Sequence, residues 1–150
     1  MATISASPGV RGVSLGRLAR GIIGGLAGGV VFGILMQAMN MIPMVAMLVN
    51  SRSLVVGWIV HLAISAFIGA TFAVIFGGRG SRMGTTLVLG VGYGVVWWVL
   101  GALLIMPARL GMDVLVFNSM AWLSLMGHVL YGLVLGGVFA LLTRRAIPTR

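Results

Sequence analysis

Four long stretches without a charged residue constrain this chain most strongly: residues 21–51, 53–78, 83–108 and 114–143. Each is longer than the ~20 residues that a helix needs to cross ~30 Å of hydrocarbon. A bilayer core offers no water to bond the backbone, so only helices and closed barrels span it. Continuous apolar runs, in place of alternation, favour helices over barrel strands. We therefore expect an all-α integral membrane protein with four transmembrane helices.

Composition supports this class, since 60% of the residues are hydrophobic and only 7% are charged. A soluble domain has about a quarter of its residues charged. We expect a single four-helix membrane domain over residues 15–150, preceded by a flexible cytoplasmic tail over residues 1–14. The chain has no cysteine, which excludes disulfides and thiolate chemistry.

The positions of the ten arginines predict the orientation of the chain in the membrane. Eight of the ten lie on one side of a four-span chain, and only Arg52 and Arg109 lie on the other. The positive-inside rule then places both termini in the cytoplasm, in a bacterial cytoplasmic (inner) membrane. The net charge of +9 comes from arginines that flank the uncharged tracts, as is typical of membrane proteins. We therefore expect membrane lipids as partners, and no nucleic acid.

The two halves of the chain share a pattern of punctuating residues, which predicts an internal repeat: repeat A over about 21–78 and repeat B over about 84–143. The aligned pairs are Pro43 with Pro107, Asn50 with Asn118, His61 with His128, and Gly69 with Gly136. We expect each proline to end a helix and each asparagine, with the serine after it, to cap the next. Two tandem helical hairpins of the same orientation follow, related by a pseudo-two-fold axis along the membrane normal.

The only two histidines lie in equivalent apolar contexts, His61 in 57–76 and His128 in 124–142. Steps of four residues from each histidine reach only small residues, and such steps stack on one face of a helix. The small residues are Gly57, Ser65 and Gly69 around the first histidine, and Ser124, Gly132 and Gly136 around the second. Small-residue ridges let transmembrane helices approach closely, so we expect the two histidines to face one another.

Three interpretations of the histidine pair are open. The imidazoles hydrogen-bond a carbonyl, a serine or one another and only stabilise packing. Alternatively His61 and His128 ligate a haem b or a chlorin, with Ser65 and Gly132 lining the space for the macrocycle. A proton relay or a quinone contact is the third interpretation, because an ionisable group inside a membrane is a functional candidate by default.

Methionine is concentrated on the side of the chain opposite most arginines, where nine of the eleven methionines lie. Thioethers are soft ligands that favour Cu(I), which makes Met36, Met39, Met44 and Met47 weak copper candidates. Methionine also fills irregular gaps without any ligand. Asp113, the only acidic residue, is expected to pair with Arg52 or Arg109.

One carboxylate, no thiol and no lysine leave little for catalysis, so we do not expect an enzyme. The leading expectation is an accessory or scaffolding subunit of a larger membrane complex, such as a respiratory or photosynthetic one, with other subunits or further copies of itself as partners. The first alternative is an electron-transfer protein that binds haem or a pigment through His61 and His128. The second is a methionine-rich protein that handles copper or a small solute.

Overall fold

The computed structural model describes residues 14–78 and 82–145, in which all regular structure is helical. Apart from residue 14, the predicted tail lies outside this part of the chain. The third span is built from α4, a π-helical segment η1, and α5. The elements are α1 (Leu15–Ala38), α2 (Ile42–Met47), α3 (Leu54–Phe76), α4 (Met83–Trp97), η1 (Trp98–Ile105), α5 (Met106–Arg109) and α6 (Ser119–Arg145).

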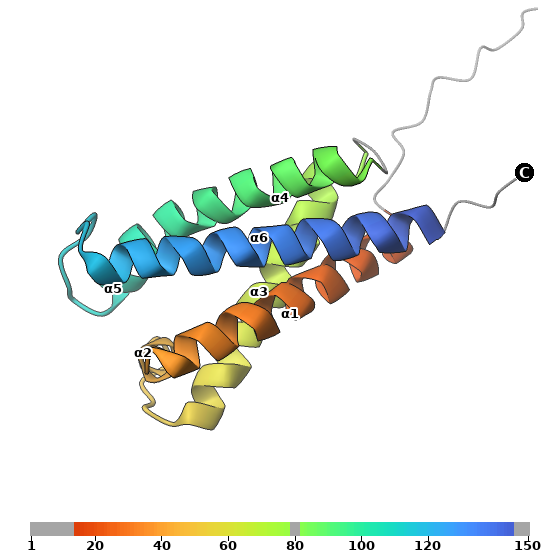
Figure 1. Cartoon of the computed structure of the whole chain (residues 1–150). Coiled ribbons are helices and arrows are strands. Elements are labelled where there is room, and N and C mark those ends of the chain that lie inside the picture. The colour runs from red at the N-terminus through yellow and green to blue at the C-terminus, as the bar shows by residue number, and fades with distance from the viewer. Residues whose placement is uncertain (1–13, 79–81, 146–150) are drawn as a thin grey trace, which may run out of the picture.

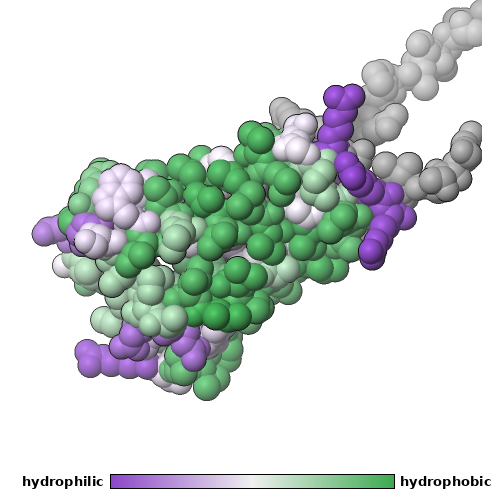
Figure 2. All heavy atoms as spheres, in the orientation of Figure 1, coloured by the Kyte–Doolittle hydropathy of each residue, from purple (hydrophilic) through white to green (hydrophobic). Residues whose placement is uncertain are grey.

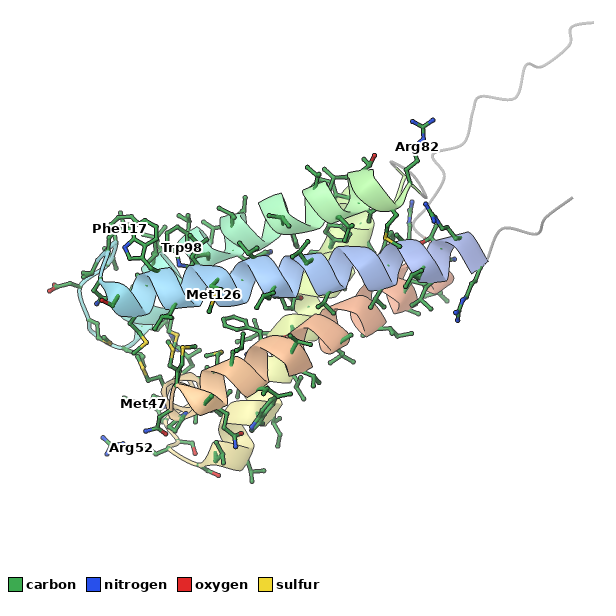
Figure 3. The ribbon with its side chains drawn as sticks, in the orientation of Figure 1. Met47, Arg52, Arg82, Trp98, Phe117 and Met126 are labelled. Carbon is green, nitrogen blue, oxygen red and sulfur yellow. The ribbon has the colours of Figure 1, made fainter. Side chains whose placement is uncertain are left out.

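Four helices are long and apolar enough to cross a membrane, with 24, 23, 27 and 27 residues, as expected for a multi-pass membrane protein. Hydrophobic side chains cover the surface between two polar ends of the molecule (Figure 2). Arg82 lies at one end and Arg52 at the other (Figure 3). We call them the arginine end, where α1 and α4 begin and α6 ends, and the α2/α5 end.

The helices form two hairpins, α1 with α3 and α4 with α6, which are joined mainly by contact between α1 and α6. By contrast, the backbones of α3 and α4 approach each other at few positions, and these two helices meet through side chains such as Tyr93 and Thr71. The hairpins diverge toward the α2/α5 end (Figure 1). A two-fold axis that exchanged α1 with α4 and α3 with α6 would make those two contacts equivalent. The predicted pseudo-symmetry is therefore not visible in the contacts, and the repeat stays a prediction.

Small residues set the close crossings within both hairpins, as the four-residue spacing predicts. A Cβ added to Gly21 or Gly25 of α1 would overlap the backbone or side chains of α3 around Gly69. A Cβ added to Gly90 of α4 would overlap the carbonyl oxygen of Gly132 in α6. Such close backbone approach supplies the van der Waals contact that holds membrane helices together.

Two tyrosines join the hairpins across the core. The hydroxyl of Tyr131 in α6 donates a hydrogen bond to the carbonyl of Ser65 in α3, at 2.9 Å. The hydroxyl of Tyr93 in α4 lies 2.6 Å from Oγ1 of Thr71 in α3. Around them pack the buried rings of the core, including the fully buried Phe72.

The predicted helix end at Pro43 is wrong. The first helix ends at Ala38, and Asn40, with a φ of 56°, turns the chain before Pro43. Pro43 instead occupies the first turn of α2, where a missing N–H costs nothing. The first connecting segment thus contains a short helix.

The predicted helix end at Pro107 is also wrong, since the helix continues to Arg109. Pro107 has no N–H to offer the carbonyl of Leu103, four residues earlier. The main-chain N–H of Leu115, in the following loop, donates to that carbonyl instead, at 2.9 Å. This bond folds residues 110–118 back over η1.

The two asparagines predicted as caps differ. Oδ1 of Asn118 accepts a hydrogen bond from the main-chain N–H of Ala121 at 2.9 Å, which is the predicted cap of α6. Asn50 instead lies in the turn after α2 with a φ of 58°, and Ser53 occupies the cap position of α3. Asn50 forms the turn in the αL conformation and does not cap α3, so the predicted cap at Asn50 is wrong.

Candidate functional site

A cavity of about 500 Å³ lies between the two hairpins, on the side of the α2/α5 end. We call it the interhairpin cavity. Every helical element, from α1 to α6 with η1, and the loop 110–118 contribute residues to its lining, and most of its surface is apolar. Pockets for small molecules have volumes of about 300–1,000 Å³, so this cavity is large enough for a ligand.

His61 of α3 lines the cavity and is fixed by the backbone of α1. Its Nε2 atom lies 2.8 Å from the carbonyl oxygen of Gly29. A carbonyl only accepts, so Nε2 carries the proton and donates it, and Nδ1 of the neutral ring is left with a lone pair. The approach of α1 depends on glycine, because a Cβ at position 29 would collide with Ser65.

His128 of α6 lines the same cavity and is fixed in a similar way by its own helix. Its Nδ1 atom lies 2.8 Å from the carbonyl oxygen of Ser124, so Nδ1 donates and Nε2 keeps the lone pair. The hydroxyl of Ser124 lies further from Nδ1, at 3.4 Å.

The second ring nitrogen of each histidine has no hydrogen-bond partner among the described residues. Neither nitrogen is fully enclosed. In the described part of the chain, only Nε of Arg17 and Nε1 of Trp97 are enclosed polar side-chain atoms without a partner. His61 Nδ1 and His128 Nε2 therefore keep accessible surface, in residues that both line the cavity.

The structure brings the two histidines to one cavity, with Phe32 of α1 against both of them. The Phe32 ring centroid lies 5.7 Å from that of His61 and 4.7 Å from that of His128, with edge-to-face geometry. Axial ligation would require one iron atom bonded to both imidazoles. Phe32 lies beside both rings, and Nε2 of His61 is already bonded to Gly29, so this geometry does not favour a haem.

The two residues predicted to line a cofactor site differ in position. Ser65 lines the cavity, and its hydroxyl donates to the carbonyl of His61 within α3, at 2.8 Å. Gly132 does not line it and packs against Gly90 of α4 instead. Gly132 therefore serves the helix crossing.

Six methionines, three from each half of the chain, border the cavity (Figure 3 shows sulfur atoms between α2 and α5). They are Met36, Met41, Met44, Met106, Met112 and Met120. Of the four copper candidates, Met36 and Met44 are in this group, whereas Met39 and Met47 do not line the cavity. The concentration of methionine in both halves indicated the group, but only the fold shows which members meet.

Asp113, the only carboxylate of the chain, also lines the cavity, from the loop 110–118. The expected pairing with Arg52 or Arg109 is wrong, because no ion pair of Asp113 is formed within residues 14–78 and 82–145. One negative charge therefore stands at the cavity without a cationic partner among these residues.

The π-helical segment η1 supplies one wall of the cavity through Gly101, Ala102 and Leu103. A Cβ added to Gly101 would meet nothing within 4 Å, so this position opens onto free space. Stretches of π-helix occur frequently at functional sites, and the sequence carries no signal that would have predicted one here.

No family model matches this chain, and no similar curated protein or solved structure was found. Among the described residues, no three side chains of His, Cys, Asp or Glu come together as a metal-binding group.

Proposed function

We propose that this chain is a membrane-embedded binding protein that holds a small, mainly apolar ligand in the interhairpin cavity. The observation that carries the proposal is the state of the two histidines. Each has one nitrogen bonded to a main-chain carbonyl and one left free, and both residues line the same cavity of about 500 Å³. If the two histidines served only helix packing, their free nitrogens would not be expected to lie at the same cavity.

The two free nitrogens define what the ligand offers. In neutral imidazoles both are acceptors, so the fitting ligand presents a hydrogen-bond donor, such as a hydroxyl, or an electron-pair acceptor. The rest of the lining is mostly apolar and suits a hydrophobic body. Few polar groups in an apolar pocket are typical of sites that orient one ligand.

Access from the lipid phase fits the same geometry. Ile64 and Phe67 of α3 and Ile105 of η1 line the cavity and are also 40%, 59% and 53% exposed. They lie on the side of α3 and α4, whose backbones stay apart and which meet there through the rings of Phe67 and Trp97, with 6.2 Å between the ring centroids. A ligand dissolved in the membrane would enter between these helices without crossing the bundle.

The test compares ligand retention by native mass spectrometry of protein purified gently from its own membranes. Wild-type protein is expected to carry a bound species that the double variant His61→Phe/His128→Phe loses. The control variant Thr71→Val lacks a polar group of α3 that does not line the cavity, and this variant should retain the bound species. Equal retention by both variants would contradict recognition through the imidazoles.

The proposed placement is in a bacterial inner membrane with both termini in the cytoplasm. The end at which α1 and α4 begin and α6 ends carries Arg17, Arg20, Arg82, Arg144 and Arg145. Arg52 and Arg109 are the only arginines toward the other end in the described residues. This asymmetry supports the orientation by the positive-inside rule, and it puts the cavity toward the outer leaflet. Duplication of one hairpin would account for the histidine in each half.

A second candidate is the accessory subunit of a larger complex. The observation that favours it is an exposed aromatic pair near the start of α6, Phe117 and Trp122. Their side chains are 57% and 55% exposed, and their ring centroids lie 6.0 Å apart. Aromatic residues are enriched in protein interfaces. Co-purification of other polypeptides with wild-type protein, lost in Phe117→Ala/Trp122→Ala, would support this candidate.

A further inference from the structure

The six methionines around the interhairpin cavity carry an inference that rests on the proposal that the cavity is a binding site and assigns it a soft metal ion in addition to an apolar ligand. We propose that the cavity is a Cu(I) site, formed by thioethers of both hairpins together with an imidazole nitrogen. The methionines are not the general filling of a core, since they border a hollow large enough for a ligand.

The donor set has the softness that Cu(I) prefers. Thioether sulfur selects Cu(I) over hard cations, and imidazole nitrogen suits copper as well. In the described residues the cavity is lined by Met36, Met41 and Met44 of the first hairpin and Met106, Met112 and Met120 of the second. Harder ions such as Mg²⁺ and Ca²⁺ require several oxygen ligands, and one carboxylate does not supply them.

The histidines have the arrangement that metal-ligating imidazoles adopt. A ligating histidine donates its other N–H to a carboxylate or a backbone carbonyl, which fixes the tautomer and the ring. His61 does so to Gly29 and His128 to Ser124, each at 2.8 Å. The free nitrogen of each ring is thus already in the state that a metal would use.

The charge of the ion has a counterpart at the site. A monovalent cation in an apolar cavity needs an opposite charge nearby, because burying an unpaired ion is costly. Asp113 lines the same cavity and has no ion pair within the described part of the chain. Thioethers are neutral, so this one carboxylate, which is exposed at the edge of the cavity, matches the charge of Cu(I) and would leave one positive charge of a divalent ion uncompensated.

Bound Cu(I) would link the hairpins where the helices diverge. One group of three methionines belongs to the first hairpin and the other group to the second, and the backbones of α3 and α4 stay apart. A ligand that binds only the folded state stabilises it by mass action. Cu(I) should therefore raise the unfolding temperature of the wild-type protein.

The test titrates purified protein with Cu(I) under reducing, anaerobic conditions against a chromophoric Cu(I) chelator. The cavity variant is Met36→Leu/Met44→Leu/Met106→Leu/Met120→Leu. The matched control changes four methionines that do not line the cavity: Met39→Leu/Met47→Leu/Met83→Leu/Met126→Leu. Leucine preserves volume and hydrophobicity, so both should fold. We expect the cavity variant to bind Cu(I) at least about 100-fold more weakly and the control to match wild type.

A second measurement needs no substitution. Protein labelled with selenomethionine and loaded with Cu(I) should show copper–selenium scattering in X-ray absorption at the copper edge. Absence of that scattering, or equal Cu(I) affinity in the two methionine variants, would overturn the copper site.

The outcomes separate this inference from the binding function on which it rests. One outcome is that the cavity variant keeps the species that is bound to the wild type, while neither protein binds Cu(I). The cavity then binds an apolar ligand, and the copper inference fails. If no species and no Cu(I) bind to wild type, both fail.

Discussion

The hydroxyl of Tyr131 in α6 donates a hydrogen bond to the main-chain carbonyl of Ser65 in α3, at 2.9 Å. Ser65 lies one helical turn after His61, and Tyr131 lies one turn after His128. This bond therefore joins the two hairpins directly beside the histidines, at two residues that both line the interhairpin cavity.

Replacement of Tyr131 by phenylalanine should loosen the union of the two hairpins. The change removes one donor across the hairpins, while the Ser65 carbonyl keeps its helical bond from the N–H of Gly69. We expect a cost of about 1 kcal/mol of unfolding free energy. Reversible unfolding in mixed detergent micelles measures this loss. A Tyr131→Phe variant as stable as wild type would mean that the hydrogen bond contributes nothing to hairpin docking.

A methyl group at the α4–α6 crossing should be far more costly than one on a free face. A Cβ at Gly90 would overlap the carbonyl of Gly132, whereas a Cβ at Gly92 would meet nothing within 4 Å. We expect Gly90→Ala to destabilise the fold by about 1–3 kcal/mol, as overpacking does. Gly92→Ala should be neutral or slightly stabilising. The same unfolding assay compares them, and equal effects would place the crossing elsewhere.

The adjacent tryptophans form a matched pair. Nε1 of Trp98 donates to the carbonyl of Ala121 at 3.0 Å, whereas Nε1 of Trp97 is enclosed and has no partner in the described residues. Both Trp→Phe changes remove the same aromatic area. Trp98→Phe should therefore be more destabilising than Trp97→Phe by about 1–2 kcal/mol, because only the former breaks a hydrogen bond. The reverse order would contradict the indole orientations.

The orientation can be tested directly because the chain has no cysteine. In single-cysteine variants of intact cells, Val114→Cys at the α2/α5 end should react with a membrane-impermeant maleimide. Gly78→Cys, after the end of α3, should react only once the cells are permeabilised. The opposite labelling pattern would place the termini outside and contradict the positive-inside argument.

Much of the architecture could be predicted from the sequence because membrane helices obey strong constraints. The uncharged tracts predict the four spans, and the four-residue spacing of small residues predicts the crossings at Gly69 and Gly132. Helix ends were less predictable. Pro107 continues its helix because Leu115 bonds the carbonyl that the proline leaves free, and that partner lies in a loop of no recognisable pattern.

The site was predictable only in part, for a related reason. His61 and His128 stood out because ionisable groups in apolar helices are rare. Their common cavity depends on α1 packing closely against α6 while the backbones of α3 and α4 stay apart, which no local pattern encodes. For the same reason the sequence-based copper candidates include Met39 and Met47, which do not line the cavity, and omit Met106 and Met120, which do.

The central claim is that the interhairpin cavity binds a ligand, and a filled cavity tests it most directly. Gly101→Leu places a side chain in the cavity from η1, where a Cβ meets nothing within 4 Å. Gly92→Leu adds the same side chain on α4, outside the cavity, and is the matched control. Native mass spectrometry should show the bound species on wild type and Gly92→Leu and not on Gly101→Leu. Retention of the species by a folded Gly101→Leu variant would contradict the claim.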